Sequence, residues 1–319
     1  MVIVAHFPPP VHGSSLVALS IAKATSAKTI DIGLMDSLDQ HGKLTFRKLV
    51  LFLKTLVTIV QVNNEQTLYI PTAKGATIWR DFLYLVCLRI RRNSITLYYL
   101  NKSDKKRESI NYVIRYLTQK LGDVILTDKL LIANTLALKS KSYRILPLWS
   151  RFEYSLKEIS VSKKVGFFSN NYRFKGIDIY EKLVQAYPKI EFIVAGAKGD
   201  YQIGEYENLL CLGALDAEEA KEFYKSIDIL IYPSRDDCFP LTILEALSAG
   251  VYILGSNVGA IPSLLDSGRG KVLEIENFIA MDIHEFWPSL TKKHSIAKSA
   301  KSKWTLNSFN EGIKSILDL

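Results

Sequence analysis

The chain has 319 residues, 48% of them hydrophobic and 23% charged, which is ordinary for a globular protein and long enough for two domains. The three cysteines, Cys87, Cys211 and Cys238, have no paired spacing and no nearby His. This pattern disfavours a disulfide framework and a zinc site, and it is typical of reduced thiols in the cytosol.

The net charge of +9 is unevenly divided along the chain. Residues 1–150 contain 21 Lys and Arg against 9 Asp and Glu, whereas residues 151–319 contain 20 against 23. A strongly basic half indicates a polyanionic partner, either nucleic acid or an anionic membrane. Basic residues alternate with apolar ones in "RDFLYLVCLRIRR" and no nucleic-acid-binding motif occurs, so we expect no nucleic-acid partner.

Short apolar runs and longer helical patterns alternate from the N-terminus onward. The start, "MVIVAHFPPPVHGSS", lacks the basic residues of a signal peptide, and "LVLFLKTLVTIVQV" is too short to span a membrane. In the first half we expect strands at 2–7, 67–72, 94–100, 123–128 and 143–148, with a helix after each of the first four.

The pattern restarts in the second half. Strands are expected at 164–169, 190–196, 209–213, 228–234 and 251–257. Buried strands followed by crossover helices predict an α/β fold of two doubly wound Rossmann-like domains, residues 1–150 and 151–319, facing a cleft. A terminal helix with an apolar stripe of Trp304, Phe309, Ile313 and Ile316 is expected to pack against either domain, with the first domain favoured.

The stretch "SRDDCFPLTILEALSAGVYILG" (234–255) combines a strand end, an acidic loop and a helix. Pro240 fits the first helical turn, and Gly250 fits a left-handed residue after the helix. The helix N-terminus, near Leu241 and Thr242, is suited to phosphate. Asp237 and Glu245 would flank that phosphate, and carboxylates there suit sugar hydroxyls and a ribose diol.

This stretch resembles the donor-site signature of the GT-B glycosyltransferases of family 4. The residues in register are Asp237, Phe239, Pro240, Glu245, Ala246, Gly250 and Gly259. Upstream, "SNNYRFKGIDI" resembles the loop that brings Arg and Lys to the donor diphosphate, and "FIVAGAKGD" resembles the next glycine loop. "GALDAEEAKEFYKSIDILIYPS" resembles the segment that begins at the base-contacting loop, and "FPPPVHGSSLVALSIA" resembles the first loop of the family. The resemblance is strong over 164–275 and loose over 1–150.

The resemblance implies a GT-B fold and a retaining hexosyltransferase or N-acetylhexosaminyltransferase. The donor would be a nucleotide-diphosphate sugar, with UDP as the default nucleotide, and the acceptor a saccharide or a lipid-linked molecule of bacterial surface polysaccharide or glycolipid synthesis. The second domain would bind the donor and the first the acceptor. No Asp-x-Asp occurs, so we expect no metal and no cofactor. The expected location is the cytoplasm, at the inner face of the membrane.

The resemblance also implies site residues. Lys175, Arg173 and Asp237 would be catalytic, and His12 would contact the acceptor. The implied donor-binding residues are Gly13, Ser14, Gly196, Gly213, Ala214, Leu215, Phe239, Pro240, Leu241, Thr242 and Glu245.

The sequence departs from the family pattern at several positions, and two of these departures, the acid at 237 and a missing His, leave a second hypothesis open. Asp237 stands where Glu is usual, and Asn170 stands at the usual Arg position, for which Arg173 would substitute. The His that often follows the N-domain strand near "TLYYLNKS" is missing. The alternative is a non-catalytic GT-B subunit that binds a sugar nucleotide or a protein partner.

Residues 41–60 carry basic side chains, including Lys43, Arg47, Lys48 and Lys54, beside many apolar ones. This pattern suits a helix lying at an anionic membrane surface, and it equally suits a core helix with a basic edge.

Overall fold

The computed structural model describes residues 1–9, 13–33, 46–71, 77–100, 110–130, 143–169, 174–196 and 201–319. The chain divides into two compact units. The N-terminal unit contains residues 1–147 and 309–319, and the C-terminal unit contains residues 148–308.

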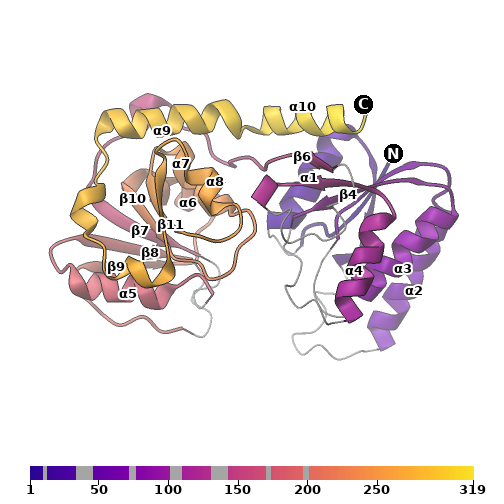
Figure 1. Ribbon diagram of the computed structural model, residues 1–319, viewed down its shortest axis with the longest axis horizontal. Coiled ribbons are helices and arrows are strands. Elements are labelled where there is room, and N and C mark those ends of the chain that lie inside the picture. Colours follow the sequence, from indigo (N-terminus) through magenta and orange to yellow (C-terminus); the bar gives the residue numbers. More distant parts are fainter. Residues whose placement is uncertain are drawn as a thin grey trace. The chain divides into compact units, whose positions relative to one another are not determined.

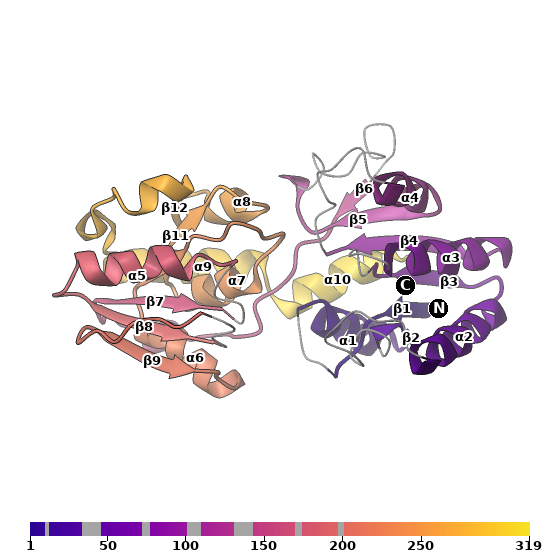
Figure 2. The same cartoon turned by 90° about the horizontal axis from the view of Figure 1, so that it is seen from below.

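The N-terminal unit is built on a six-stranded parallel sheet of order β2-β1-β3-β4-β5-β6 (Figures 1 and 2). Its strands are β1 (Val2–Ala5), β2 (Lys28–Asp31), β3 (Gln66–Tyr69), β4 (Ser94–Tyr99), β5 (Asp123–Leu126) and β6 (Tyr143–Ile145). Its helices are α1 (Gly13–Thr25), α2 (Phe46–Gln61), α3 (Thr77–Ile90), α4 (Ile110–Lys120) and most of α10 (Leu306–Ile316).

Alternate residues of each strand face opposite sides of this sheet, as the two-residue repeat of a strand requires. Leu97 and Tyr99 join a core with Ile59 of α2 and Leu85 of α3. Tyr98 faces the other way and stacks on Phe309 of α10, with ring centroids 6.5 Å apart. The sheet is therefore covered on both faces, which explains the nearly continuous apolar strands.

The C-terminal unit has a second six-stranded parallel sheet, of order β12-β11-β10-β7-β8-β9. Its strands are β7 (Lys164–Phe168), β8 (Glu191–Ala195), β9 (Leu209–Gly213), β10 (Ile229–Tyr232), β11 (Tyr252–Ser256) and β12 (Gly270–Leu273). Its helices are α5 (Ile177–Ala186), α6 (Ala217–Ser226), α7 (Leu241–Ser248), α8 (Ile261–Leu265) and α9 (Leu290–Lys303).

Each sheet has a topological switch point, which is the place where successive strands are added on opposite sides of the first strand. In the C-terminal unit the chain moves from β7 to β8 on one side, while β10 pairs with β7 on the other. In the N-terminal unit β1 pairs with β2 on one side and β3 on the other. Ligands of open parallel sheets bind beyond the carboxyl ends of the strands at such points.

The predicted fold class, two doubly wound α/β sheets, is confirmed. Two strands, β2 and β12, are not recognisable in the sequence pattern. Both are edge strands with several exposed or half-buried positions, so they lack the continuous apolar run of a central strand.

The terminal helical pattern is divided, because α9 ends at Lys303 and α10 begins at Leu306. Phe309 and Ile313 are buried and Ile316 is half-buried. Side chains of Gln66 and Arg144 donate hydrogen bonds to the carbonyl oxygens of Leu317 and Ile316, each at 2.8 Å. Within the described residues, no helix combines the length and the apolar character needed to cross a bilayer.

Candidate functional site

The loops after β7 and β10 meet at the switch point of the C-terminal sheet. Lys175 lies in the first loop and Asp237 in the second, and their side chains form an ion pair. The Lys175 ammonium also lies 3.3 Å from the carbonyl oxygen of Asp236, as a donor. These neighbouring strands are far apart in sequence, so the parallel sheet itself brings the two charges together.

Further contacts fix the two loops to each other. Arg235 donates two hydrogen bonds to the carboxylate of Asp178 in the first turn of α5, at 2.8 and 2.6 Å, and its backbone amide donates to the Phe174 carbonyl at 3.0 Å. Gly176 has a φ of +78°, and a Cβ there would lie 2.3 Å from the Pro233 carbonyl oxygen. Only glycine fits this close approach without a shift, so it sets the position of Lys175.

The Asp237 carboxylate is held on three sides. Its Oδ1 accepts from the Cys238 amide at 2.9 Å, and its Oδ2 accepts from the Tyr232 hydroxyl at 2.6 Å as well as from Lys175. Burial and the neighbouring Asp237 charge raise the pKa of Tyr232 well above its usual value, so this hydroxyl remains a proton donor. Asp237 is therefore oriented by the protein before any ligand arrives.

Helix α7 begins directly after this loop, with Pro240 as its N-cap residue, and Gly250 follows it at a φ of +76°. The predicted helix and the left-handed glycine after it are confirmed. Leu241 and Thr242, at the helix start, are half-buried, and Phe239 is buried. The unpaired amides of a helix N-terminus suit an anion.

Glu245, one turn into α7, is only 1% exposed. Its Oε1 accepts a hydrogen bond from Arg151 in an ion pair, and its Oε2 accepts from the Tyr224 hydroxyl at 3.0 Å. Burial and the Glu245 charge raise the pKa of Tyr224 well above its usual value. Arg151 is 35% exposed and lies over the Phe152 ring, 5.1 Å from its centroid, so it forms the solvent-facing side of this cluster.

The remaining predicted donor-site residues of the C-terminal unit follow the other strands of the same sheet. Gly196 comes directly after β8, and Gly213 ends β9; the Gly196 amide donates to the Gly213 carbonyl at 2.6 Å. Ala214 is exposed and Leu215 half-buried, before α6. The strand ends thus gather these residues at the edge that carries Lys175 and Asp237.

In the N-terminal unit, Gly13 and Ser14 begin helix α1 beyond β1, at the switch point of that sheet. His12, Arg173 and Asn170 lie outside the described residues. The acceptor role of His12 and the diphosphate role of Arg173 stay predictions from the sequence.

Three residues that complete the cluster are absent from the sequence prediction. Tyr232 and Tyr224 bind the two carboxylates, and Arg151 covers Glu245. Tyr232 could have been found, because it lies at the end of an apolar strand next to the acidic loop. Arg151 and Tyr224 are far from Glu245 in sequence and carry no local signal. Within the described residues, no three His, Cys, Asp or Glu side chains are grouped in a way that could hold a metal ion.

Residues 162–283 match the model of a protein family described as glycosyl transferases group 1. The matched segment lies within the C-terminal unit. The chain is 32% identical over 106 residues to an uncharacterized glycosyltransferase of Methanocaldococcus jannaschii, covering 28% of this chain and 26% of that protein. It is 36% identical over 93 residues to alpha-galactosylglucosyldiacylglycerol synthase of Streptococcus pneumoniae, covering 25% of each. The matches thus span about a quarter of the length of these curated relatives.

Solved structures extend the likeness beyond the group 1 segment. HepE from Anabaena, in complex with UDP, has a TM-score of 0.75 at 17% identity and matches 99% of each chain. Sucrose-phosphate synthase from Thermosynechococcus elongatus has a TM-score of 0.69 at 14% identity, covering 99% of this chain and 97% of that one. The predicted GT-B fold is therefore confirmed over the whole chain.

Proposed function

We propose that this protein is a retaining, metal-independent glycosyltransferase that moves a sugar from a nucleotide-diphosphate donor to a saccharide or lipid-linked acceptor. The observation that carries the proposal is the meeting of Lys175 and Asp237 at the switch point of the C-terminal sheet, beside the N-terminus of α7. HepE, which has the same fold, is in complex with UDP. UDP is therefore the first nucleotide to test.

The leaving diphosphate gains negative charge as the sugar–phosphate bond breaks. The Lys175 ammonium is paired with Asp237, and a diphosphate at the start of α7 would compete for the same ammonium. The lysine and the helix amides would then stabilise the leaving group. Asp237 would lose its ion pair with Lys175 but keep its hydrogen bonds from Tyr232 and the Cys238 amide. Its carboxylate could then accept hydrogen bonds from sugar hydroxyls.

The Glu245 cluster gives the donor ribose a defined partner. A ribose diol would have to take the place of Arg151, since Glu245 is only 1% exposed and Arg151 forms the solvent-facing side of its cluster. Arg151 is partly exposed and is the member of the cluster that can leave. We infer that donor binding requires Arg151 to move from Glu245.

The same cluster favours one alternative, a non-catalytic subunit. If Arg151 holds Glu245 permanently, the unit would keep its fold and ion pairs but bind no ribose. The missing His near Tyr99 and Leu100 supports the same alternative.

Thermal-shift binding against a panel of nucleoside diphosphates and sugar nucleotides, followed by a transfer assay with lipid-linked acceptors, tests the proposal. We expect one sugar nucleotide to stabilise the protein and to release its nucleoside diphosphate on transfer, and Lys175→Ala to lower turnover strongly. Donor binding without transfer or slow hydrolysis would support a non-catalytic subunit that binds a sugar nucleotide. No binding by any nucleotide would refute the enzyme and would support a subunit that binds a protein partner, with Arg151 held on Glu245.

We further propose that the N-terminal unit attaches the enzyme to the inner face of an anionic membrane, where a bacterial lipid-linked acceptor of surface polysaccharide or glycolipid synthesis would be met. Helices α2, α3 and α4 lie side by side in both views (Figures 1 and 2). Each exposes large apolar side chains, which together form what we term the apolar helix face. Its members are Phe46, Leu49, Leu53, Val57, Val60, Trp79, Leu83, Ile90, Val113, Tyr116 and Leu117.

The apolar helix face revises the interfacial segment expected from the sequence. Phe52 and Leu56 pack against the core of the N-terminal unit, whereas Phe46, at 82% exposure, and Val57, at 59%, are presented to solvent. Exposed basic side chains accompany the three helices, at Lys54, Arg89, Arg91, Arg92 and Lys120. Apolar side chains with basic neighbours suit an interface with anionic lipid. Lys43, Lys102, Lys105, Lys106 and Arg107 lie outside the described residues.

A further inference from the structure

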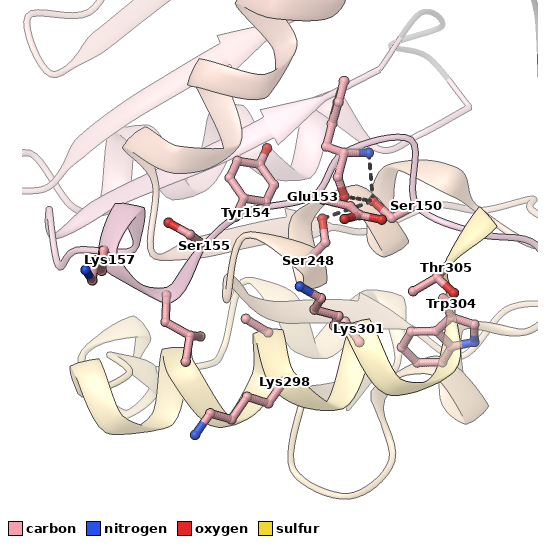
Figure 3. Close-up of a pocket in the computed structure, with 14 residues that line it drawn as sticks. Ser150, Glu153, Tyr154, Ser155, Lys157, Ser248, Lys298, Lys301, Trp304 and Thr305 are labelled. Atoms are coloured by element: carbon pink, nitrogen blue, oxygen red, sulfur yellow. Dashed lines mark hydrogen bonds between the residues drawn. The ribbon is translucent and has the colours of Figure 1, made fainter. Parts of the chain in front are cut away.

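A cavity of about 460 Å³ lies within the C-terminal unit, away from the strand ends that carry Lys175 and Asp237. One wall is the segment 150–157, which enters the unit, and the other is the second half of α9 with Trp304 and Thr305, where the chain leaves it (Figure 3). Its volume falls in the range of small-molecule pockets, about 300–1,000 Å³.

The lining of this cavity is mostly apolar. Phe152, Tyr154 and Trp304 contribute aromatic side chains that are largely buried, and Ala297 and Ala300 of α9 leave room between them. Ligand pockets typically combine such walls with a few charged groups that fix orientation. The body of a ligand seated here would be apolar.

The charged groups at the cavity are mainly basic. Lys157, Lys298 and Lys301 belong to the lining, against Glu153 as the acidic member. Helix α9 carries five lysines and no acidic residue. Figure 3 shows the Lys301 ammonium directed toward Ser248 and the segment 150–157, whereas Lys298 points away from it. Lys301 is thus placed to bind an anionic head group.

The cavity is connected to the Glu245 cluster through three consecutive residues. Ser150 and Phe152 line the cavity, and Arg151 between them is paired with Glu245. Ser150 Oγ lies 3.0 Å from Ser248 Oγ, and the Ser248 hydroxyl donates to the Glu245 carbonyl at 2.7 Å. The Ser150 amide also donates to the Trp304 carbonyl at 3.0 Å, which joins the two walls.

We propose that this cavity binds an amphiphilic anion, with its apolar body against Phe152, Tyr154 and Trp304 and its head group at Lys301. A ligand in this position fixes the segment 150–152 in the conformation that keeps Arg151 on Glu245. Binding of the anion and binding of the donor nucleotide therefore oppose each other, and this second statement rests on the proposed function. The head group is a carboxylate, as in a fatty acid, or a phosphate monoester, as in a lipid phosphate.

Calorimetric titration of the full chain with decyl phosphate, decanoate, decanol and inorganic phosphate tests the site, each below the concentration at which it aggregates. We expect both amphiphilic anions to bind, and the tighter one identifies the head group. Decanol and inorganic phosphate should bind at least tenfold more weakly than that anion. Decanol binding as tightly as the anion would show that the charge contributes nothing to affinity, and inorganic phosphate binding as tightly would show the same of the apolar body. Either result would overturn the proposal.

Two variants locate the binding. Lys301→Ala should weaken binding of the tighter anion about fivefold or more and leave decanol unchanged, and Ala300→Leu should remove binding by filling the cavity. Lys303→Ala, on the same helix but outside the lining, is the charge-matched control. Lys301 is exposed, so its variant keeps the test valid if Ala300→Leu fails to fold. Equal binding by Lys301→Ala and Lys303→Ala would show adsorption elsewhere and overturn the site.

Titration with UDP, with and without saturating anion, tests whether anion binding weakens nucleotide binding. Coupling between sites typically changes affinity about 5- to 150-fold, so the dissociation constant for UDP should rise at least fivefold, and Arg151→Ala should remove the rise. An unchanged UDP affinity would overturn the coupling. Failure of UDP and every other nucleotide to bind would refute the proposed function, while the nucleotide-free titrations still decide the site.

Discussion

The C-terminal unit concentrates its polar chemistry where parallel strands end, whereas the N-terminal unit presents apolar side chains on the outer faces of three helices. In the first, Asp237 and Glu245 are each held by two or more partners. In the second, residues such as Leu53 and Val57 have more than 40% of their surface exposed. A small ligand is bound by a few polar groups at fixed positions, whereas binding to a membrane requires a broad apolar surface.

The contrast also explains why the two proposed functions are unequally visible in sequence. The candidate donor site draws Asp237, Glu245 and the start of α7 from one segment of some 20 residues, so it has a recognisable spacing. The apolar helix face draws on three separate helices, and only packing decides which of their apolar residues remain outside. The expected effects of substitution follow the same division.

Removal of Lys175 should have the largest effect. Loss of one preorganised charge-stabilising donor typically lowers kcat about 10²- to 10³-fold, and we expect this for Lys175→Ala with a smaller change in KM for the donor. Initial rates of sugar transfer measure it. Lys182→Ala, an exposed lysine on α5, is the matched control. A twofold effect or less would remove Lys175 from the mechanism.

Replacement of Glu245 should act on donor affinity. A hydrogen bond to a charged group contributes about 1.5–3 kcal/mol, so Glu245→Gln should weaken donor binding about 10- to 150-fold, as measured by calorimetry. Glu245→Ala should also destabilise the unit by about 1–3 kcal/mol, because the buried Tyr224 hydroxyl loses its acceptor. Donor affinity equal to that of the wild type in Glu245→Gln would contradict the ribose role.

A charge placed in the apolar helix face should weaken membrane binding. Insertion of one large aliphatic side chain contributes about 1.5–3 kcal/mol, so Leu53→Asp should lower binding to anionic vesicles roughly tenfold or more. Thr58→Asp, exposed on the same helix, adds the same charge without removing an apolar side chain. Co-sedimentation should also weaken as salt is raised. Equal losses in both variants would show that charge alone mediates the attachment, and absence of binding by wild type would refute it.

The smallest expected effect separates backbone strain from steric contact in the C-terminal unit. Gly259 has a φ of +57°, and a Cβ there would lie 2.4 Å from the Asp237 carbonyl oxygen; Gly213 has a φ of +74° but open space around it. A left-handed alanine costs about 1–2 kcal/mol, which we expect for Gly213→Ala in urea unfolding. Gly259→Ala should cost about 1 kcal/mol more, within the usual range for a disturbed backbone contact. Equal losses would indicate that the Asp237 loop moves freely away from Gly259.

Much of the fold is determined by the sequence alone. Two series of apolar strands and crossover helices predict the two parallel sheets, and the position of α7, with Pro240 before it and Gly250 after it, follows from local turn chemistry. The same segment also determines that Asp237 lies in the loop before α7 and Glu245 on the helix itself. These features depend on residues close together in the chain, where periodicity and backbone preference act directly.

The tertiary structure decides the rest, because it depends on contacts between residues far apart in the chain. The edge strands β2 and β12 form because they pair with β1 and β11, and not because of their own apolar character. Arg151 reaches Glu245 only because the segment entering the C-terminal unit packs beside α7. The same packing, together with the end of α9 before Trp304, creates the cavity next to Lys301. Local spacing cannot encode such contacts, since each needs side chains from elements that only the folded sheet and its covering helices bring together.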